Sequence, residues 1–152
     1  MKSIVAYQLF LLLLIAAAGC LISQGLLPSW LEAMRVPIMC GMAGGLGGIT
    51  YCLRGVYLNA CVRKQWDEAW RPWYFIRPIV SVICGAVSFV FLKAGLLVLD
   101  AAQKENANRL GFYALAFIAG LNVDKFVAKL EDIAHATWGI EKSRANQDEK
   151  KE

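Results

Sequence analysis

Two basic residues lie within or beside long apolar runs, where a charge is costly. Arg54 stands near the end of the apolar stretch that begins at Val36, and Lys93 stands inside the apolar stretch 78–99. An ionisable side chain inside a membrane helix is by default a functional candidate. Both side chains are also long enough to reach a membrane surface along their own helix, which is the simpler interpretation. The sequence therefore offers Arg54 and Lys93 as candidate functional charges.

No side-chain arrangement in the sequence is typical of catalysis or metal binding. The five cysteines lack metal-ligand spacing, and His135 has no second His or Cys nearby. Asp124, Glu131 and Asp132 fit the solvated face of a lysine-containing helix. The glycine-rich stretch 41–48 lacks the Lys-Ser/Thr that ends a phosphate-binding loop. We therefore expect no catalytic residues, no cofactor and no metal.

The elements that position these residues are apolar blocks long enough to cross a membrane. Of the 152 residues, 58% are hydrophobic and only 18% are charged, against about a quarter charged in a soluble domain. The pattern predicts an all-α membrane protein with four transmembrane helices in one domain, 1–140. The predicted spans are about 4–23, 36–58, 78–99 and 110–127. The last is extended as one amphipathic cytoplasmic helix to about 140, and 141–152 is a charged tail that we expect to be disordered.

The first block has a second interpretation as a cleaved signal peptide. Residues 17–20, which end in Cys20, resemble a bacterial lipobox, although Ala17 stands where such boxes usually carry leucine. We expect an uncleaved anchor.

Small residues within the second and third spans recur at the spacing that lets membrane helices approach closely. Gly41 and Gly45, and Gly44 and Gly48, are pairs four residues apart. Ser81, Gly85 and Ser88 form a similar stripe on the third span. These seven positions are predicted to be helix-packing sites, and a stripe lining a narrow pore is the alternative for the third span.

Aromatic residues follow the second span among basic ones. Trp66, Trp70 and Trp73 recur at helical spacing, which is typical of an aromatic belt at the membrane surface. Basic and aromatic residues together can also indicate nucleic-acid binding, but the flanking spans favour the belt, so no nucleic acid is expected. The amphipathic extension carries a second candidate partner surface, made by Phe126, Leu130 and Trp138.

Basic residues are distributed unevenly between the two sides that four spans would define. Twelve of the 16 lie on the side shared by Lys2, residues 54–77 and the C-terminal region, and three lie on the other side. By the positive-inside rule, both termini are predicted to be cytoplasmic.

Two segments carry a resemblance to a known pattern. IRPIVSVICGAVSFVFLKAGLLVL and ALAFIAGLNVDKFVAKLED resemble an uncharacterised family of small four-helix bacterial inner-membrane proteins. The resemblance covers the second half of the chain and implies four spans and a bacterial inner (plasma) membrane. It transfers no activity and no site residues. Comparable membrane subunits occur in phage-defence systems, which makes such a system a possible context.

These patterns favour a non-enzymatic membrane subunit, an oligomeric scaffold or sensor that docks a cytoplasmic protein partner. The excess of glycine faces indicates a homo-oligomer within the lipid bilayer. The alternative is a small oligomeric pore or membrane-disrupting effector, suggested by the Ser81/Gly85/Ser88 stripe and Lys93. A lipid- or quinone-modifying enzyme ranks last, because no acid–base pair is present.

Overall fold

A computed structural model describes residues 1–25, 28–95 and 105–141, and all the regular structure in these ranges is helical. In chain order the elements are α1 (Lys2–Ser23), η1 (Ser29–Met34), α2 (Arg35–Tyr57), the π-helical turn η2 (Leu58–Val62), η3 (Glu68–Trp70), α3 (Arg71–Lys93), α4 (Glu105–Leu121) and α5 (Val123–Trp138). Three stretches are long and apolar enough to cross a membrane, and a bent pair makes a fourth if it counts as one span. The predicted all-α class is confirmed, and of the four predicted spans the structure supports three, or four if the bent pair forms one span.

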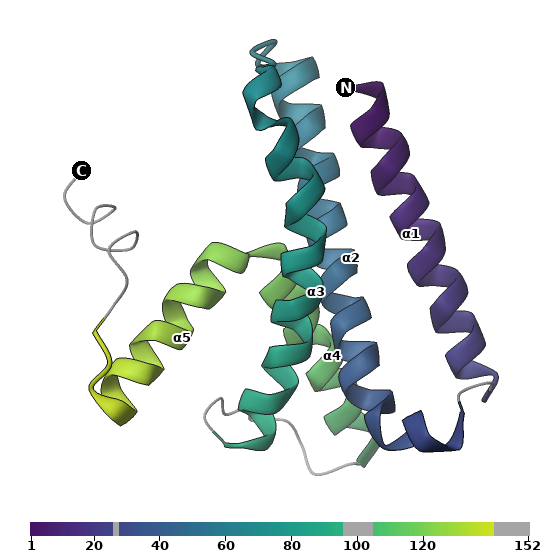
Figure 1. Cartoon of the computed structure of the whole chain (residues 1–152), viewed down its shortest axis with the longest axis vertical. Helices are drawn as coiled ribbons and strands as arrows, with labels where there is room; N and C mark the ends of the chain where they lie inside the picture. Colours follow the sequence, from purple (N-terminus) through teal and green to yellow (C-terminus); the bar gives the residue numbers. More distant parts are fainter. Residues whose placement is uncertain (26–27, 96–104, 142–152) are drawn as a thin grey trace.

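Helix α2 is the centre of the bundle, and α1, α3 and α4 all pack against it (Figure 1). The chain runs along α1, back along α2 and forward again along α3, so Met1, η2 and η3 lie at one end (Figure 1). We call this the N-terminal end. η1 and the last turn of α3 lie at the opposite end.

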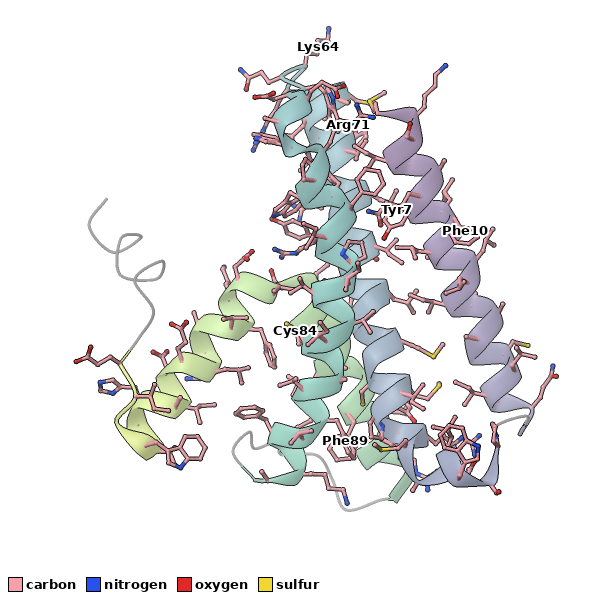
Figure 2. The ribbon with its side chains drawn as sticks, in the orientation of Figure 1. Tyr7, Phe10, Lys64, Arg71, Cys84 and Phe89 are labelled. Carbon is pink, nitrogen blue, oxygen red and sulfur yellow. The ribbon has the colours of Figure 1, made fainter. Side chains whose placement is uncertain are left out.

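Helix α1 is held to the bundle mainly near its start. Ile4 is fully buried against Cys52, Val56 and Tyr74. Further along, Phe10 is 62% exposed and points away from the bundle (Figure 2). Exposed leucines continue this face, as expected of a helix that is apolar all round and surrounded by lipid.

Three glycines bring α2, α3 and α4 into backbone contact. A Cβ atom on Gly44 would lie 2.7 Å from the Cα of Gly85, and one on Gly120 would lie 2.7 Å from the Cα of Gly44. Real Cβ contacts do not come this close, so any side chain here would force the helices apart. The absence of side chains lets the three backbones gain dispersion contacts with one another.

Helix α3 begins at Arg71, not at Pro78 as the sequence suggested. Pro72 stands in its first turn, where proline is tolerated. Pro78 lies inside the helix and has no N–H to donate to the carbonyl of Tyr74, four residues earlier. Gln8 of α1 supplies the missing donor, since its Nε2 lies 2.7 Å from the Tyr74 oxygen. A polar residue in the middle of an apolar helix thus lets a proline remain inside its neighbour.

Lys93 is the last residue of α3 and is exposed, which corrects the expectation that it lies well inside a span. The helix ends here because Gly95 takes a left-handed conformation, with φ of 71°, and closes the final turn. Residues 96–99, the remainder of the expected span, lie outside the described residues.

The fourth span and its amphipathic extension are not one helix, which corrects the expected continuous helix. α4 and α5 meet at Asn122, where ψ is 56°, and their axes bend by 109°. Gly120 contacts Gly44, the tenth residue of the 23-residue α2, so α4 stops about halfway along the bundle (Figure 1). From there α5 turns back toward the opposite end (Figure 1). That both termini share one side of the membrane therefore stays a prediction.

Candidate functional site

Arg77 is a charged residue buried inside the bundle, with only 5% of its surface exposed. Its Nη1 donates to Oδ2 of Asp124, the second residue of α5, at 2.8 Å. Its guanidinium carbon lies 4.6 Å from the centre of the Tyr51 ring and 5.1 Å from that of Trp73. The negative faces of the two rings and the carboxylate together offset the loss of water around this cation.

Two nitrogens of Arg77 have no partner. Nε and Nη2 are buried and make no hydrogen bond within the part of the chain that the structure describes. Buried donors without a partner are costly and rare in native structures. Asp124, in contrast, leaves 77% of its side chain exposed. The pair therefore joins a buried cation to an exposed carboxylate on the surface of the bundle.

The backbone around Arg77 is fixed by the same contact that joins the three helices. The hydroxyl of Ser81 lies 2.9 Å from the carbonyl oxygen of Arg77 and 3.0 Å from that of Gly120. Ser81 is fully buried and packs where Gly48 lacks a side chain. The end of α4, and therefore the start of α5, is set against the turn of α3 that carries Arg77.

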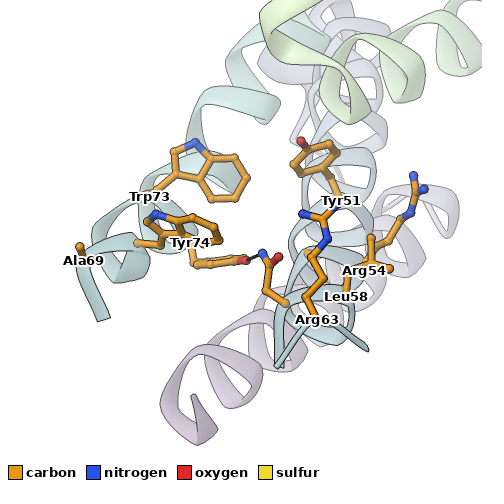
Figure 3. A pocket seen from close by; sticks show the side chains of 10 residues that line it. Tyr51, Arg54, Leu58, Arg63, Ala69, Trp73 and Tyr74 are labelled. Carbon is orange, nitrogen blue, oxygen red and sulfur yellow. Dashed lines mark hydrogen bonds between the residues drawn. The ribbon is translucent and has the colours of Figure 1, made fainter. Parts of the chain in front are cut away.

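A pocket adjoins this arginine at the N-terminal end of the bundle, between α2 and the start of α3 (Figure 3). Its volume is about 510 Å³, within the range of small-molecule sites. The lining residues are Tyr51, Arg54, Gly55, Leu58, Asn59, Arg63, Ala69, Trp70, Trp73 and Tyr74. Tyr51 and Trp73 also stack on Arg77, so the pocket and the buried arginine share two walls.

The turn after α2 places a second arginine on this pocket. Leu58–Val62 form a π-helical turn, closed by the Arg63 amide donating to the Leu58 carbonyl at 2.8 Å. Lys64 then takes a left-handed backbone conformation with φ of 53°, which is uncommon for a residue with a side chain. In Figure 3 Arg63 extends toward Tyr51, whereas Arg54 points away from Trp73. π-helical turns often occur at functional sites because they re-aim side chains.

The small residues predicted for helix packing lie between helices. Gly44, Gly48, Ser81 and Gly85 lie where α2 meets α3, and a Cβ on Gly41 or Gly45 would also meet Val82 of α3. Ser88 is fully buried and donates to the carbonyl of Gly85 at 2.7 Å. Two further glycines of this kind, Gly47 of α2 and Gly120 of α4, lie where these two helices meet and were not singled out from the sequence.

The tryptophans predicted as an interface do not form one surface. Trp70 and Trp73 line the pocket, whereas Trp66 is partly buried and stacks on Tyr74 with ring centres 5.6 Å apart. On α5, Phe126 and Leu130 are partly buried and Trp138 is 62% exposed. The predicted candidate charges also separate: Arg54 reaches the pocket, and Lys93 lies at the far end of α3.

The pair of Arg77 and Asp124 was missed by sequence reasoning, which counted Arg77 only among the basic residues of 54–77 and assigned Asp124 to a solvated face. The signal that could have found Arg77 is Pro72, because proline suits the first turn of a helix and a helix that starts there places Arg77 inside it. Among the described residues, no group of three His, Cys, Asp or Glu side chains could hold a metal ion.

Length, hydropathy and fold define this chain as an all-α, multi-pass membrane protein with a buried arginine beside a basic aromatic pocket. No protein-family model, curated protein or solved structure matches the chain. The resemblance to small bacterial inner-membrane proteins, and the defence context that it suggests, stay predictions.

Proposed function

We propose that this chain is a non-enzymatic membrane scaffold subunit that works as a homo-oligomer, with α5 as the arm by which one copy holds the next. The observation that supports this is the position of α5. It starts about halfway along the bundle, and its contacts within the described chain are few, the main ones being with α3 and α4 (Figure 1).

A charged helix at this depth needs protein around it. Lys125 and Lys129 are exposed on one face of α5, while α3 beside it exposes Ile79 and Ile83 as a lipid-facing helix does. Each unshielded charge at the middle of a bilayer costs about 2.5–3.5 kcal/mol. A neighbouring copy that packs on α5 would remove this cost, because it can supply opposite charges and polar backbone ends.

The pair of Arg77 and Asp124 is the fixed end of the arm. It anchors the first turn of α5 to α3, and the remaining turns expose apolar side chains such as Val127 and Trp138. The scaffold proposal therefore assigns the amphipathic helix to contacts between copies, where the sequence had suggested a cytoplasmic protein partner.

The pore alternative loses its main support. Ser81 and Ser88 are fully buried and bonded to backbone carbonyls, and Gly85 is in contact with Gly44. No face of this stripe is left to line a channel within one chain.

The test is the molar mass of the complex in lipid nanodiscs, measured for the native chain and two variants. Val127→Asp adds a charge to the exposed apolar edge of α5, and Gln65→Asp adds the same charge at an exposed position of the N-terminal end, away from α5. We expect a multiple of the chain mass for the native protein, a lower multiple for Val127→Asp and no change for Gln65→Asp. A single chain in the native sample, at every protein concentration, would overturn the proposal.

A further inference from the structure

We propose that the pocket at the N-terminal end binds the phosphate headgroup of an anionic membrane lipid. The lining comes from one chain only, so this site does not depend on the oligomer proposed above.

The charge of the pocket fits a phosphate. Arg54 and Arg63 both line it, and neither forms an ion pair with any carboxylate in the described ranges. Arg71 lies close by in sequence but is already paired with Glu68 at 2.8 Å. Guanidinium groups bind phosphate oxygens through paired, charge-assisted hydrogen bonds. Arg63, which extends toward Tyr51, supplies this direct contact, and Arg54 adds positive charge at the edge of the pocket.

Polar groups in the pocket complete the recognition of a headgroup. The side-chain amide of Asn59 donates to the Tyr74 hydroxyl at 3.4 Å, a long contact that leaves its carbonyl oxygen available to accept a bond. Tyr51 places a hydroxyl on the same wall. These groups suit the ester and hydroxyl oxygens of a glycerol-based headgroup.

The apolar surroundings favour a lipid over a free phosphate. Trp70 and Trp73 are 44% and 40% exposed, and such rings favour the depth of lipid headgroups. Below Trp73 on the same helix, Ile76 and Ile83 are 57% and 56% exposed. They continue the tryptophan face at helical spacing, so an acyl chain can lie along them while its phosphate reaches Arg63.

The position of the pocket agrees with this occupant. Ile4, Val56 and Tyr74 form the last buried apolar layer at this end, and the pocket lies beside and beyond it. In Figure 2 Lys64 and Arg71 mark the same end, where charged side chains replace apolar ones. The headgroup region of a bilayer lies at this boundary when α1, α2 and α3 cross it.

The experiment is native mass spectrometry of the purified chain titrated with phosphatidylglycerol or with phosphatidylcholine of identical acyl chains. Arg63→Gln removes the inward cation, and Arg71→Gln is the matched control, because it removes an arginine from the same segment that does not line the pocket. We expect phosphatidylglycerol to bind at least tenfold more tightly than phosphatidylcholine. Arg63→Gln should weaken its binding about tenfold, as loss of one charged hydrogen bond predicts, and Arg71→Gln less than twofold.

Two further ligands distinguish a lipid headgroup from a soluble phosphate as the occupant of the pocket. Glycerol 3-phosphate and inorganic phosphate carry the charge without acyl chains, and we expect neither to displace the lipid at equal concentration. Displacement by either would overturn the lipid assignment in favour of a soluble phosphate. Equal binding of the two lipids, or equal losses in the two variants, would overturn the site itself. If Arg63→Gln does not fold, Arg54→Gln at the rim replaces it, with an expected loss of about threefold.

Discussion

The contact between α2 and α3 changes in character along its length. Around Gly44 and Gly85 the two backbones touch, and no side chain separates them. Toward the N-terminal end Tyr51, Trp73 and Tyr74 stand between the same two helices and leave a pocket of about 510 Å³. One pair of helices thus holds a region of backbone contact and a region of large polar and aromatic side chains.

The region of backbone contact suits stability, and the aromatic region suits ligand binding. Backbone contact through glycine has a single close arrangement and leaves no room for a ligand, so it fixes the helices relative to one another. Among the described residues, the aromatic region holds a buried arginine with two unpartnered nitrogens and two arginines that pair with no carboxylate. Unpartnered buried donors lower stability, so this region is better suited to contacts with a ligand. Variants in the first region should therefore affect folding most, and variants in the second should affect ligand and α5 contacts.

The largest effect is expected from Gly44→Ala. The new Cβ would meet the backbone of Gly85 and Ser81, which cannot move aside without separating the helices. Overpacking of this kind costs about 3 kcal/mol, the upper end of the usual range. Unfolding in mixed micelles by titration with SDS measures this loss. Gly19→Ala is the control, because its Cβ would meet only the terminal methyl of Met42, at 3.3 Å. Equal losses would contradict the difference between the two regions.

Gln8→Leu is expected to destabilise the bundle by about 2 kcal/mol, because it leaves the Tyr74 carbonyl buried without a donor. The explanation has a specific test in a double-mutant cycle with Pro78→Ala. Alanine at 78 has a backbone N–H that can donate to the Tyr74 carbonyl. Gln8→Leu should therefore cost about 1 kcal/mol less in the Pro78→Ala background. Additive losses would show that Gln8 does not compensate for the proline.

The sequence predicted the helical class and the extent of the first two apolar helices closely. Apolar content over about 20 residues is a local property, and it needs no knowledge of neighbours. The break at Asn122 was missed because the apolar spacing continues through it, with Val123, Phe126 and Leu130 in helical register. Only the contact of Gly120 with Gly44 shows that α4 ends in the bundle, and that contact depends on tertiary structure.

The site was predicted less well than the fold. Spacing identified Gly44 and Gly48, because small residues four apart share a helix face, but it could not assign Gly47 to a third helix. Charge counting treated Arg77 like Arg63 and Arg71, since all three follow the same span. Arg77 differs from the other two because it is buried and paired with Asp124. That partner lies 47 residues further along the chain, so local sequence does not reveal it.

A smaller effect is expected from Asp124→Asn. It removes the carboxylate from Arg77, but Asp124 is largely exposed, so the loss should be about 1 kcal/mol and not the 3–5 kcal/mol of a fully buried pair. Hydrogen exchange should increase across α5 and remain unchanged in α2. Lys2→Gln, which removes an exposed charge at the start of α1, away from α5, is the control. Unchanged exchange in α5 would show that the pair does not anchor this helix.

The smallest effect is expected from Lys93→Ala, which compares a cation at the end of α3 with Arg77 inside it. Lys93 is exposed at the last helical position, so its charge is not buried, and it gains only a few tenths of a kcal/mol from the helix dipole. We expect a change below about 0.5 kcal/mol in the micelle assay and no change in lipid binding by native mass spectrometry. Arg77→Gln in the same assays should destabilise the protein measurably, because it exchanges a stacked and paired guanidinium for a shorter amide. A loss above about 1 kcal/mol for Lys93→Ala would restore Lys93 as a functional charge.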